Sequence, residues 1–311
     1  MNIKHHNNVL TIVAPTKGEL ENSLVDALTD HLFALGLNPS PPKWLSSSEA
    51  CDIYYTATYP HEALEGISSI LNSVKIDFHA QRTIFRKKKI LVADMDSTII
   101  TSETIDELAI IAGCGPEVAS ITERSMKGEL IFGAAVKERV AMLSGLSAKV
   151  IDKILKGIRL SKGAKTLVRT MATHGALTIM VSGGFKNFSD PVAKKVGFDQ
   201  NYANRLEIID GKLTGKVFNP ILGPNAKKET LIAASSGYGA SMLETLAIGD
   251  GANDIPMIKA AGLGIAYRGK PITRKASGNY SNKQSTGALI DYTNLTAALF
   301  FQGYMRKEFT K

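Results

Sequence analysis

The sequence contains little cysteine. Cys51 and Cys114 are its two cysteines, and no C-x-x-C motif joins them. Two thiols so placed exclude a framework of disulfides and give no sign of a redox couple or a zinc site. The six histidines are mostly scattered and show no metal-ligand spacing. We expect both cysteines to be buried free thiols.

Long hydrophobic runs are also missing. No apolar stretch approaches the roughly 18 to 20 residues that a membrane span needs. The short apolar segment over residues 9–14 has no signal-peptide cleavage site after it. The composition, with 44% hydrophobic and 21% charged residues, excludes disordered and fibrous proteins. We expect a cytoplasmic protein of about two domains that does not associate with membranes.

Acidic residues are outnumbered. Lys and Arg number 37 against 29 Asp and Glu, which gives a net charge of +8. A basic chain raises the question of an anionic partner, but the basic residues are mostly dispersed. The one dense run, residues 86–89, precedes an apolar stretch, and we expect it to be a solvated entrance to a strand. The positive field suits small phosphorylated anions, and we expect no nucleic acid partner.

Residues 1–82 are predicted to form a small α/β unit. Strand-like segments cover residues 9–14 and 52–57, and helical periodicity covers residues 18–35 and 62–74. Extended chain follows from residue 75. The resulting βαββαβ order predicts a ferredoxin-like domain. This unit shows no catalytic cluster.

The pattern changes in residues 83–311. Short apolar strands alternate there with helical stretches, which predicts an α/β fold with a parallel sheet flanked by helices. Residues 102–160 contain no convincing strand and are predicted to form an inserted helical cap of the kind that carries specificity. Asp210-Gly211 lies between two strand-like runs and predicts a hairpin. The predicted strands cover residues 90–93, 177–181, 245–248 and 263–266; residues 269–287 are expected to be rich in loops and residues 294–305 to form a closing helix.

Acidic side chains follow two of the predicted strands. Asp94 and Asp96 come directly after residues 90–93, and Asp250 and Asp254 come after residues 245–248. The carboxyl ends of parallel strands form the ligand crevice, so these acids should converge there. Carboxylates so close need a cation or a proton between them. Oxygen-only ligands of this kind favour Mg²⁺.

Two further motifs suit an anion at the same edge. Ser182-Gly183-Gly184 follows a third strand and offers a hydroxyl and accessible backbone N–H groups. Lys227 and Lys228 open a predicted helix, where one ammonium can reach the same oxygens. Taken singly, Asp-x-Asp, Ser-Gly-Gly, Lys-Lys and Gly-Asp-Gly-x-Asn-Asp are each common in turns, loops or exposed helix ends. Their joint appearance in this order favours a site for a phosphorylated ligand.

The four motifs together resemble the haloacid dehalogenase (HAD) superfamily over residues 88–290. Within it, the run from Asp96 to Glu107 and the later hairpin are similar to the phosphoserine phosphatases. The resemblance implies a HAD-like Rossmannoid sheet with a cap. Residues 1–82 resemble the ACT-like, amino-acid-binding domain that precedes the catalytic part of some bacterial members. The implied reaction is the hydrolysis of O-phospho-L-serine to L-serine and phosphate, the last step of phosphorylated serine biosynthesis.

The resemblance also implies roles for individual residues. Asp94 is the nucleophile that forms an aspartyl phosphate, and Asp96 is the general acid and base, with a pKa raised towards neutrality. Mg²⁺ is held by Asp94, by the backbone carbonyl of Asp96 and by Asp250. The phosphoryl oxygens are bound by Ser182, Gly183 and Lys227. Lys227 matches the family position better than Lys228 does. Asn253 binds substrate or, together with Asp254, orients the ligands, and Thr98 braces the loop.

Substrate choice is implied to come from the cap. Glu103 receives the substrate ammonium and Arg139 clamps its carboxylate. Met126 and Phe132 match apolar positions that close over the substrate. Without the resemblance, Arg139 is more typical of an exposed helix face and Phe132 of a core.

Two other functions stay open at this point. One is a HAD relative with the same core and another substrate or acceptor, such as a sugar phosphate or homoserine. The other is a non-catalytic protein that senses amino acids or binds nucleic acid, as the basic charge and the N-terminal unit allow. A homodimer and serine binding by the N-terminal domain are further hypotheses.

Overall fold

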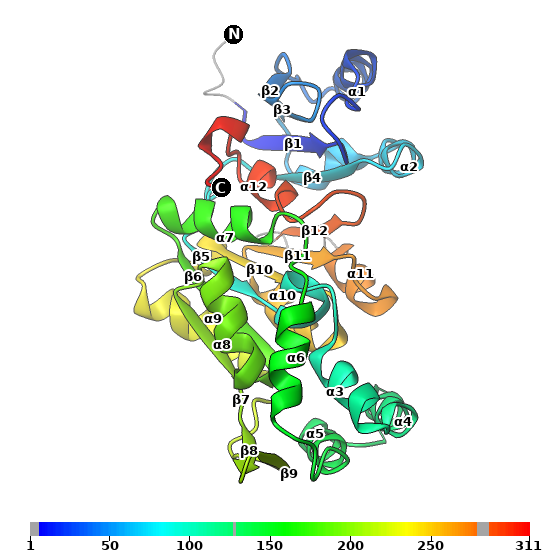
Figure 1. The fold of residues 1–311 in the computed structure, drawn as a ribbon. Helices are drawn as coiled ribbons and strands as arrows, with labels where there is room; N and C mark the ends of the chain where they lie inside the picture. Colours follow the sequence, from blue (N-terminus) through cyan, green and yellow to red (C-terminus); the bar gives the residue numbers. More distant parts are fainter. Residues whose placement is uncertain (1–5, 127–128, 279–285) are drawn as a thin grey trace.

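The computed structural model describes residues 6–126, 129–278 and 286–311. It contains a four-stranded antiparallel sheet, a six-stranded parallel sheet and a two-stranded hairpin (Figure 1). Among the described residues, no helix combines the length and apolar character needed to cross a bilayer. Cys51 and Cys114 are free and buried, as predicted.

The N-terminal part has the βαββαβ order that the sequence predicts. Its sheet runs in the order β2-β3-β1-β4, and one face packs on helices through a separate apolar core. Strand β1 lies in the middle and pairs antiparallel with both β3 and β4. The elements are β1 (Asn8–Val13), α1 (Asn22–Ala34), β2 (Lys43–Ser46), β3 (Ala50–Tyr55), α2 (Ser68–Ser73) and β4 (Asp77–Arg82).

The prediction of one continuous helix over residues 62–74 is wrong. A 3₁₀ turn, η2 (Pro60–Leu64), is separated from α2 by Gly66, whose φ is +77°. Side chains rarely adopt this left-handed backbone conformation, so the helix ends here. A Cβ on Gly66 would also lie 3.2 Å from the His31 ring. The periodicity of the apolar residues does not reveal this break.

The larger sheet has the order β12-β11-β10-β5-β6-β7, and all its strands are parallel. Strand β5 lies inside the sheet and is buried on both faces: Leu91 and Ala93 face one apolar core, while Ile90 and Val92 face the other. Helices cover both faces (Figure 1). The strands are β5 (Ile90–Ala93), β6 (Leu177–Phe185), β7 (Gln200–Asn204), β10 (Thr245–Gly249), β11 (Leu263–Tyr267) and β12 (Thr286–Ile290), and the helices are α7 (Ala164–Thr173), α8 (Lys186–Val196), α9 (Ala226–Gly237), α10 (Ile255–Ala260), α11 (Pro271–Gly278) and α12 (Ala297–Phe301).

Two edge regions of this sheet differ from the prediction. Strand β7 was not predicted, because Gln200–Asn204 is polar and half exposed. Residues 269–287 are not simply loop: α11 occupies much of this stretch, and β12 begins at its end. The closing helix α12 is shorter than the predicted residues 294–305.

Between β5 and α7, the described residues form helices in the lower half of Figure 1. They are α3 (Thr104–Ala112), α4 (Gly115–Met126), α5 (Phe132–Ala141) and α6 (Lys149–Gly157). The segment that leads out of the sheet domain and the segment that returns to it lie side by side, because Ile100 and Leu160 form an antiparallel β-bridge. The predicted hairpin is observed as β8 (Leu206–Ile209) and β9 (Lys212–Val217), with Asp210 and Gly211 both at positive φ in the turn.

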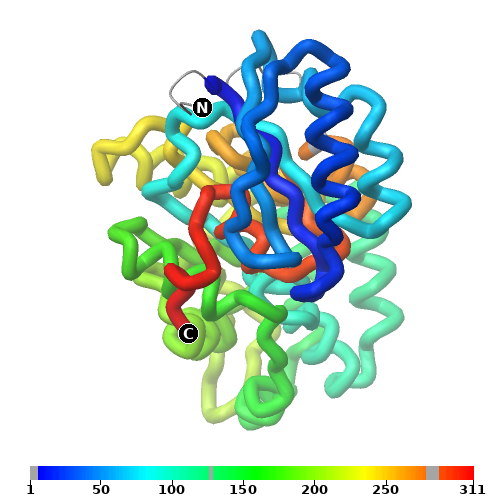
Figure 2. Tube along the Cα trace, turned by 90° about the horizontal axis from the view of Figure 1, so that it is seen from above, coloured from blue at the N-terminus to red at the C-terminus, as the bar shows by residue number. Residues whose placement is uncertain are grey.

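The basic run at residues 86–89 is not a solvated strand entrance. Arg86 and Lys88 are buried, while the side chains of Lys87 and Lys89 are more than half exposed. The Arg86 guanidinium bonds both oxygens of Asp52 at 2.7 Å and also donates to the carbonyls of Phe300 and Phe301. Figure 2 shows the C-terminal segment, in red, running beside the blue N-terminal strands. Arg86 therefore joins the N-terminal sheet to the end of the chain.

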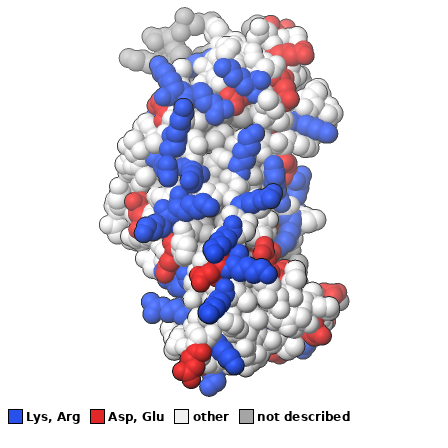
Figure 3. Space-filling model, viewed as in Figure 1, with Lys and Arg blue, Asp and Glu red and all other residues white. Residues whose placement is uncertain are grey.

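The remaining basic residues are dispersed. Figure 3 shows Lys and Arg side chains spread over the length of one face, with fewer Asp and Glu. In Figure 1 helices α6, α7 and α8 lie on this side. The picture fits the dispersed positive charge that the sequence indicates.

Candidate active site

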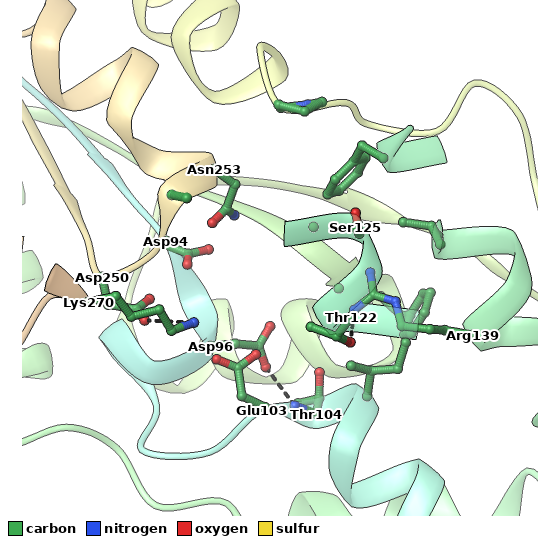
Figure 4. Close-up of a pocket in the computed structure, with 18 of the residues that line it drawn as sticks. Asp94, Asp96, Glu103, Thr104, Thr122, Ser125, Arg139, Asp250, Asn253 and Lys270 are labelled. Atoms are coloured by element: carbon green, nitrogen blue, oxygen red, sulfur yellow. Dashed lines mark hydrogen bonds and ion pairs between the residues drawn. The ribbon is translucent and has the colours of Figure 1, made fainter. Parts of the chain in front are cut away.

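A cavity of about 470 Å³ opens between the carboxyl ends of β5, β6 and β10 and the inserted helices (Figure 4). Crevices at this edge are the usual ligand sites of open α/β sheets. The cavity is lined both by residues from strand ends and by residues from α3, α4 and α5. Of the residues singled out from the sequence, those that line it are Asp94, Asp96, Glu103, Phe132, Arg139, Gly183, Gly184, Asp250 and Asn253.

The loop after β5 turns two carboxylates into this cavity. The Asp94 N–H donates to the carbonyl of Ile248 on the neighbouring strand at 2.9 Å, which continues the sheet pairing. Ser97 then adopts φ +56° and reverses the chain. The Ser97 hydroxyl donates to Glu103 Oε1 at 2.7 Å. Asp94, Asp96 and Glu103 therefore come from one tightly bonded loop.

Lys227, on the first turn of α9, lies between two carboxylates. Its Nζ is 2.6 Å from Asp94 Oδ1 and 2.5 Å from Asp254 Oδ1. The second oxygen of Asp254 accepts the N–H groups of Asp250 at 3.1 Å and Gly251 at 2.9 Å. Asp254 is fully buried, and these partners occupy three of the roughly four acceptor positions of its carboxylate. Asp254 therefore has the contacts of an orienting group.

Three carboxylates are close enough to share a metal ion. Oxygens of Asp94, Asp250 and Asp254 lie within 4.8 Å of one another. Asp254 is already bonded to Lys227 and to two N–H groups. Asp94 and Asp250 therefore have the carboxylate oxygens that are better placed to bind a metal ion. The Thr98 hydroxyl lies 3.4 Å from Asp250 Oδ1. This oxygen-only donor set fits Mg²⁺ better than a softer metal.

The carboxylates are short of positive charge. Burial raises the pKa of Asp250 to about 6, and repulsion by Asp254 adds to the effect. Burial and Asp254 also raise the pKa of Asp94, against the attraction of Lys227. Burial opposes the charge of Lys227, but Asp254 and Asp94 outweigh it and raise the pKa of this lysine. The site thus holds one firmly charged ammonium and favours a further cation.

Asp96 differs from Asp94 in its partners. Its Oδ1 accepts the N–H of Thr104 at 2.9 Å, and the Ser182 hydroxyl donates to its Oδ2 at 3.2 Å. Burial raises the pKa of Asp96 to about 6, and Glu103 contributes to the rise. A carboxyl group with such a pKa exchanges protons readily near neutrality.

A second, much smaller pocket adjoins the cavity and shares Phe132, Gly183 and Asn253 with it. It is lined by Ser182, Gly183, Lys227 and Asn253, with Phe132 from the cap. The Asn204 side chain holds this loop, because its Nδ2 donates to the Gly183 carbonyl at 2.8 Å. Asn204 was not predicted from the sequence, because it belongs to no recognisable motif.

The inserted helices bring the opposite wall. Arg139 on α5 is partly buried, donates to Thr122 Oγ1 at 3.4 Å, and Figure 4 shows it across the cavity from Asp94. Burial lowers the pKa of Arg139, and Asp106 and Glu103 offset part of that effect. Phe132 lines the cavity at the start of α5. Met126 ends α4, but its side chain lies outside the described part of the structure.

Lys270, Thr122 and Ser125 also line the cavity and were not predicted from the sequence. Lys270 follows β11 at the same sheet edge as the predicted motifs, and this position was the available signal. Its Nζ is 3.7 Å from Asp250 Oδ2. Thr122 and Ser125 lie one turn apart on α4, and no motif marks them.

Comparisons with known proteins agree with this arrangement. The family model described as haloacid dehalogenase-like hydrolase matches residues 91–259. Phosphoserine phosphatase SerB2 of Mycobacterium tuberculosis is 36% identical over 288 residues, covering 91% of this chain and 68% of that protein. A phosphoserine phosphatase of Streptococcus thermophilus is 48% identical over 187 residues, covering 60% of this chain and 87% of that protein. The crystal structure of a HAD family hydrolase of Salmonella enterica serovar Typhi has a TM-score of 0.80 and 26% identity, covering 94% of this chain and 98% of that one.

Proposed function

Because the chain belongs to the haloacid dehalogenase-like hydrolase family, we propose that it is a phosphoserine phosphatase, which hydrolyses O-phospho-L-serine to L-serine and phosphate. One observation carries the choice of substrate: Glu103 and Arg139 line the same cavity as Asp94. Phosphoserine has an ammonium and a carboxylate beyond its phosphate, so its site needs one acid and one base. The mycobacterial and streptococcal relatives bear this enzyme's name.

Asp94 is the nucleophile in this proposal. Its carboxylate attacks phosphorus, the bond from phosphorus to the serine oxygen breaks, and an aspartyl phosphate forms. Lys227, at 2.6 Å, favours the ionised form of Asp94 and opposes the burial and the Asp254 charge that raise its pKa. Asp254 holds Lys227 in place from the other side.

Asp96 moves the proton in both halves of the reaction. It first gives its proton to the departing serine oxygen, and later takes one from the water that attacks the aspartyl phosphate. The same group must act as acid and then as base, which needs a pKa near neutrality. The raised pKa of Asp96, about 6, supports this role.

Mg²⁺ is the proposed cofactor, held by Asp94, Asp250 and the backbone carbonyl of Asp96. When bound, it supplies positive charge to the carboxylates and to the phosphoryl oxygens. The Ser182 hydroxyl, the Gly183 N–H and the Lys227 ammonium bind those oxygens, and Asn253 lies beside them. Thr98 braces Asp250.

The cap residues bind the amino acid part of the substrate. Glu103 receives the ammonium, and Ser97 fixes one Glu103 oxygen by a hydrogen bond. Arg139 binds the carboxylate. Phe132 covers the phosphoryl end, and Met126 is proposed to close the same side.

We further propose a division into residues 1–82, residues 83–311 and a cap at residues 102–160. The first unit is proposed to be ACT-like, a proposal supported by its βαββαβ order and sheet order. Serine binding by that unit, a homodimer and a cytoplasmic location stay predictions.

A panel assay tests the proposed function. O-Phospho-L-serine, p-nitrophenyl phosphate and a sugar phosphate are compared at equal concentration, with Mg²⁺ and with a chelator, and with homoserine as a competing acceptor. We expect phosphoserine to be hydrolysed fastest, only with Mg²⁺, and with free phosphate as the product. Phosphohomoserine as the main product would favour the phosphotransferase, and no turnover of any ester would favour the non-catalytic alternative.

A further inference from the structure

Lys270 is a cation of the cavity to which the proposed chemistry gives no task. It lies between β11 and α11, and its Nζ is 3.7 Å from Asp250 Oδ2. Its backbone N–H donates to the Asp250 carbonyl at 2.9 Å. Figure 4 shows the two side chains joined at the edge of the cavity that also holds Asp94 and Asp96.

The backbone of Lys270 is fixed, whereas its side chain is not. The Lys270 carbonyl accepts the N–H groups of Thr273 at 2.9 Å and Arg274 at 3.0 Å on the first turn of α11. Arg274 pairs in turn with Asp291, whose N–H is bound by Asp77 of the N-terminal sheet. The Lys270 side chain itself is 50% exposed, and 3.7 Å is longer than a hydrogen bond. The ammonium can therefore move while its anchor stays still.

The other cations at or beside the cavity make shorter polar contacts than Lys270 does. Lys227 is bonded on two sides by Asp94 and Asp254. Arg139 belongs to the cap and donates to Ala135 and Thr122. Among the lining residues that the structure describes, Lys270 is the cation with a single long contact to a carboxylate.

We propose that Lys270 is a positioning residue that balances cation and anion binding in this cavity: it stands beside Asp250 before Mg²⁺ binds, and afterwards turns to the phosphoryl group. Like charges repel, so Lys270 weakens the binding of Mg²⁺ by Asp250. Opposite charges attract, so the same ammonium strengthens the binding of a phosphate anion. The substrate part of this inference rests on the proposed function, whereas the metal part does not.

The expected effects are moderate, because the ammonium is half exposed and water screens it. Removing the charge should change each affinity by about three- to tenfold. The signs are the distinctive feature. Loss of Lys270 tightens Mg²⁺ binding and loosens phosphate binding, whereas a merely structural role would weaken both.

The test uses the full chain with Lys270→Gln, Lys270→Arg and Lys275→Gln. Lys275 is an exposed lysine of the same helix, α11, and does not line the cavity, so Lys275→Gln is the matched control. Calorimetry measures the Kd of Mg²⁺ without substrate, and then the Kd of inorganic phosphate with Mg²⁺ present. We expect Lys270→Gln to lower the first and raise the second, and Lys270→Arg and Lys275→Gln to match the wild type.

The inference is overturned if Lys270→Gln leaves both Kd values unchanged, or if it raises both of them as a loss of fold would. A thermal melt of each variant identifies such a loss. Phosphoserine hydrolysis by the wild type is measured separately. A wild type that hydrolyses phosphoserine, together with unchanged Kd values in Lys270→Gln, rejects this inference alone. Opposite Kd shifts together with an inactive wild type support it and reject the proposed function.

Discussion

The molecule contains two groups of buried charge that differ in how they are balanced. At the junction of the N-terminal sheet and the C-terminal segment, Arg86 meets Asp52 twice at 2.7 Å and donates to two backbone carbonyls. Asp77 at the same junction accepts the N–H groups of three successive residues, 291–293. The cavity, by contrast, has more carboxylates than cations. Its carboxylates are Asp94, Asp96, Glu103 and Asp250, and the cations at or beside it are Lys227, Lys270 and Arg139.

The charges at the junction serve the structure, whereas those in the cavity serve the function. A buried ion pair with all its hydrogen bonds made adds little net energy but is costly to break, so it holds two parts of a chain in one arrangement. Carboxylates that lack compensating charge raise one another's pKa and attract ligands that supply it. The junction is therefore complete in the chain alone, whereas the cavity favours a cation and a phosphorylated substrate.

The largest expected effect follows from Asp94→Asn in the cavity. An amide cannot form the aspartyl phosphate, so kcat for phosphoserine should fall at least about a thousandfold. The amide is nearly the same size as the carboxylate, so the protein should stay folded. Steady-state kinetics and a thermal melt measure both. A variant that keeps a tenth of the activity would contradict the assigned role.

The junction should respond in the opposite way. Arg86→Met leaves Asp52 buried without its partner, which costs about 3 to 5 kcal/mol of unfolding free energy. Activity of the protein that remains folded should change little, because Arg86 does not line the cavity. Urea denaturation and kcat measure the two effects. Adding Asp52→Asn should recover part of the stability, and a stable single variant would show that the pair is dispensable.

Arg139→Ala should separate substrate recognition from chemistry. Removing a charged partner of the substrate carboxylate should raise KM for phosphoserine about 10- to 100-fold, as a charge-assisted hydrogen bond is lost. KM for p-nitrophenyl phosphate, which has no carboxylate, should hardly change. The ratio of kcat/KM for the two esters is the measurement. Equal losses on both substrates would reject the clamp.

The last expected effect is a pH dependence of stability and concerns Lys88 at the junction. Burial lowers the pKa of Lys88 to about 7, and Glu244 offsets only part of this. Above that pH the folded state holds a neutral amine, whose two N–H groups match the carbonyls of Phe85 and Leu243. The unfolded chain keeps its proton up to its ordinary pKa near 10.4, so stability should rise between about pH 7 and 10.

Lys88→Met removes the group that produces this slope. Denaturation curves of the wild type and the variant at several pH values test the prediction. The contribution of one proton is at most about 1.4 kcal/mol per pH unit. Parallel curves for the two proteins would show that Lys88 is not the source.

The sequence predicts the cavity better than the junction, and the reason is physical. Asp94 and Asp250 each follow a buried apolar strand, and Ser182 lies in the last half of β6. The parallel sheet brings these strand ends together wherever they lie in the chain. Lys270 has the same placement after β11 but no motif of its own.

The junction depends on partners far apart in the sequence. Burial of Arg86 requires Asp52 and the carbonyls of Phe300 and Phe301, none of which a local pattern links to it. A charged run is ordinarily solvated, so the basic segment suggested exposure. The missed strand β7 is a similar case, because a polar edge strand takes its structure from the neighbour it pairs with.

The central claim is that phosphorus passes from serine to Asp94 and then to water. Hydrolysis of a thiophosphate ester of serine that is chiral at phosphorus, carried out in isotopically labelled water, tests it most directly. Each in-line displacement inverts phosphorus, so the two-step route predicts a product with net retention of configuration. Net inversion would mean that water attacks the ester directly, and would contradict the account.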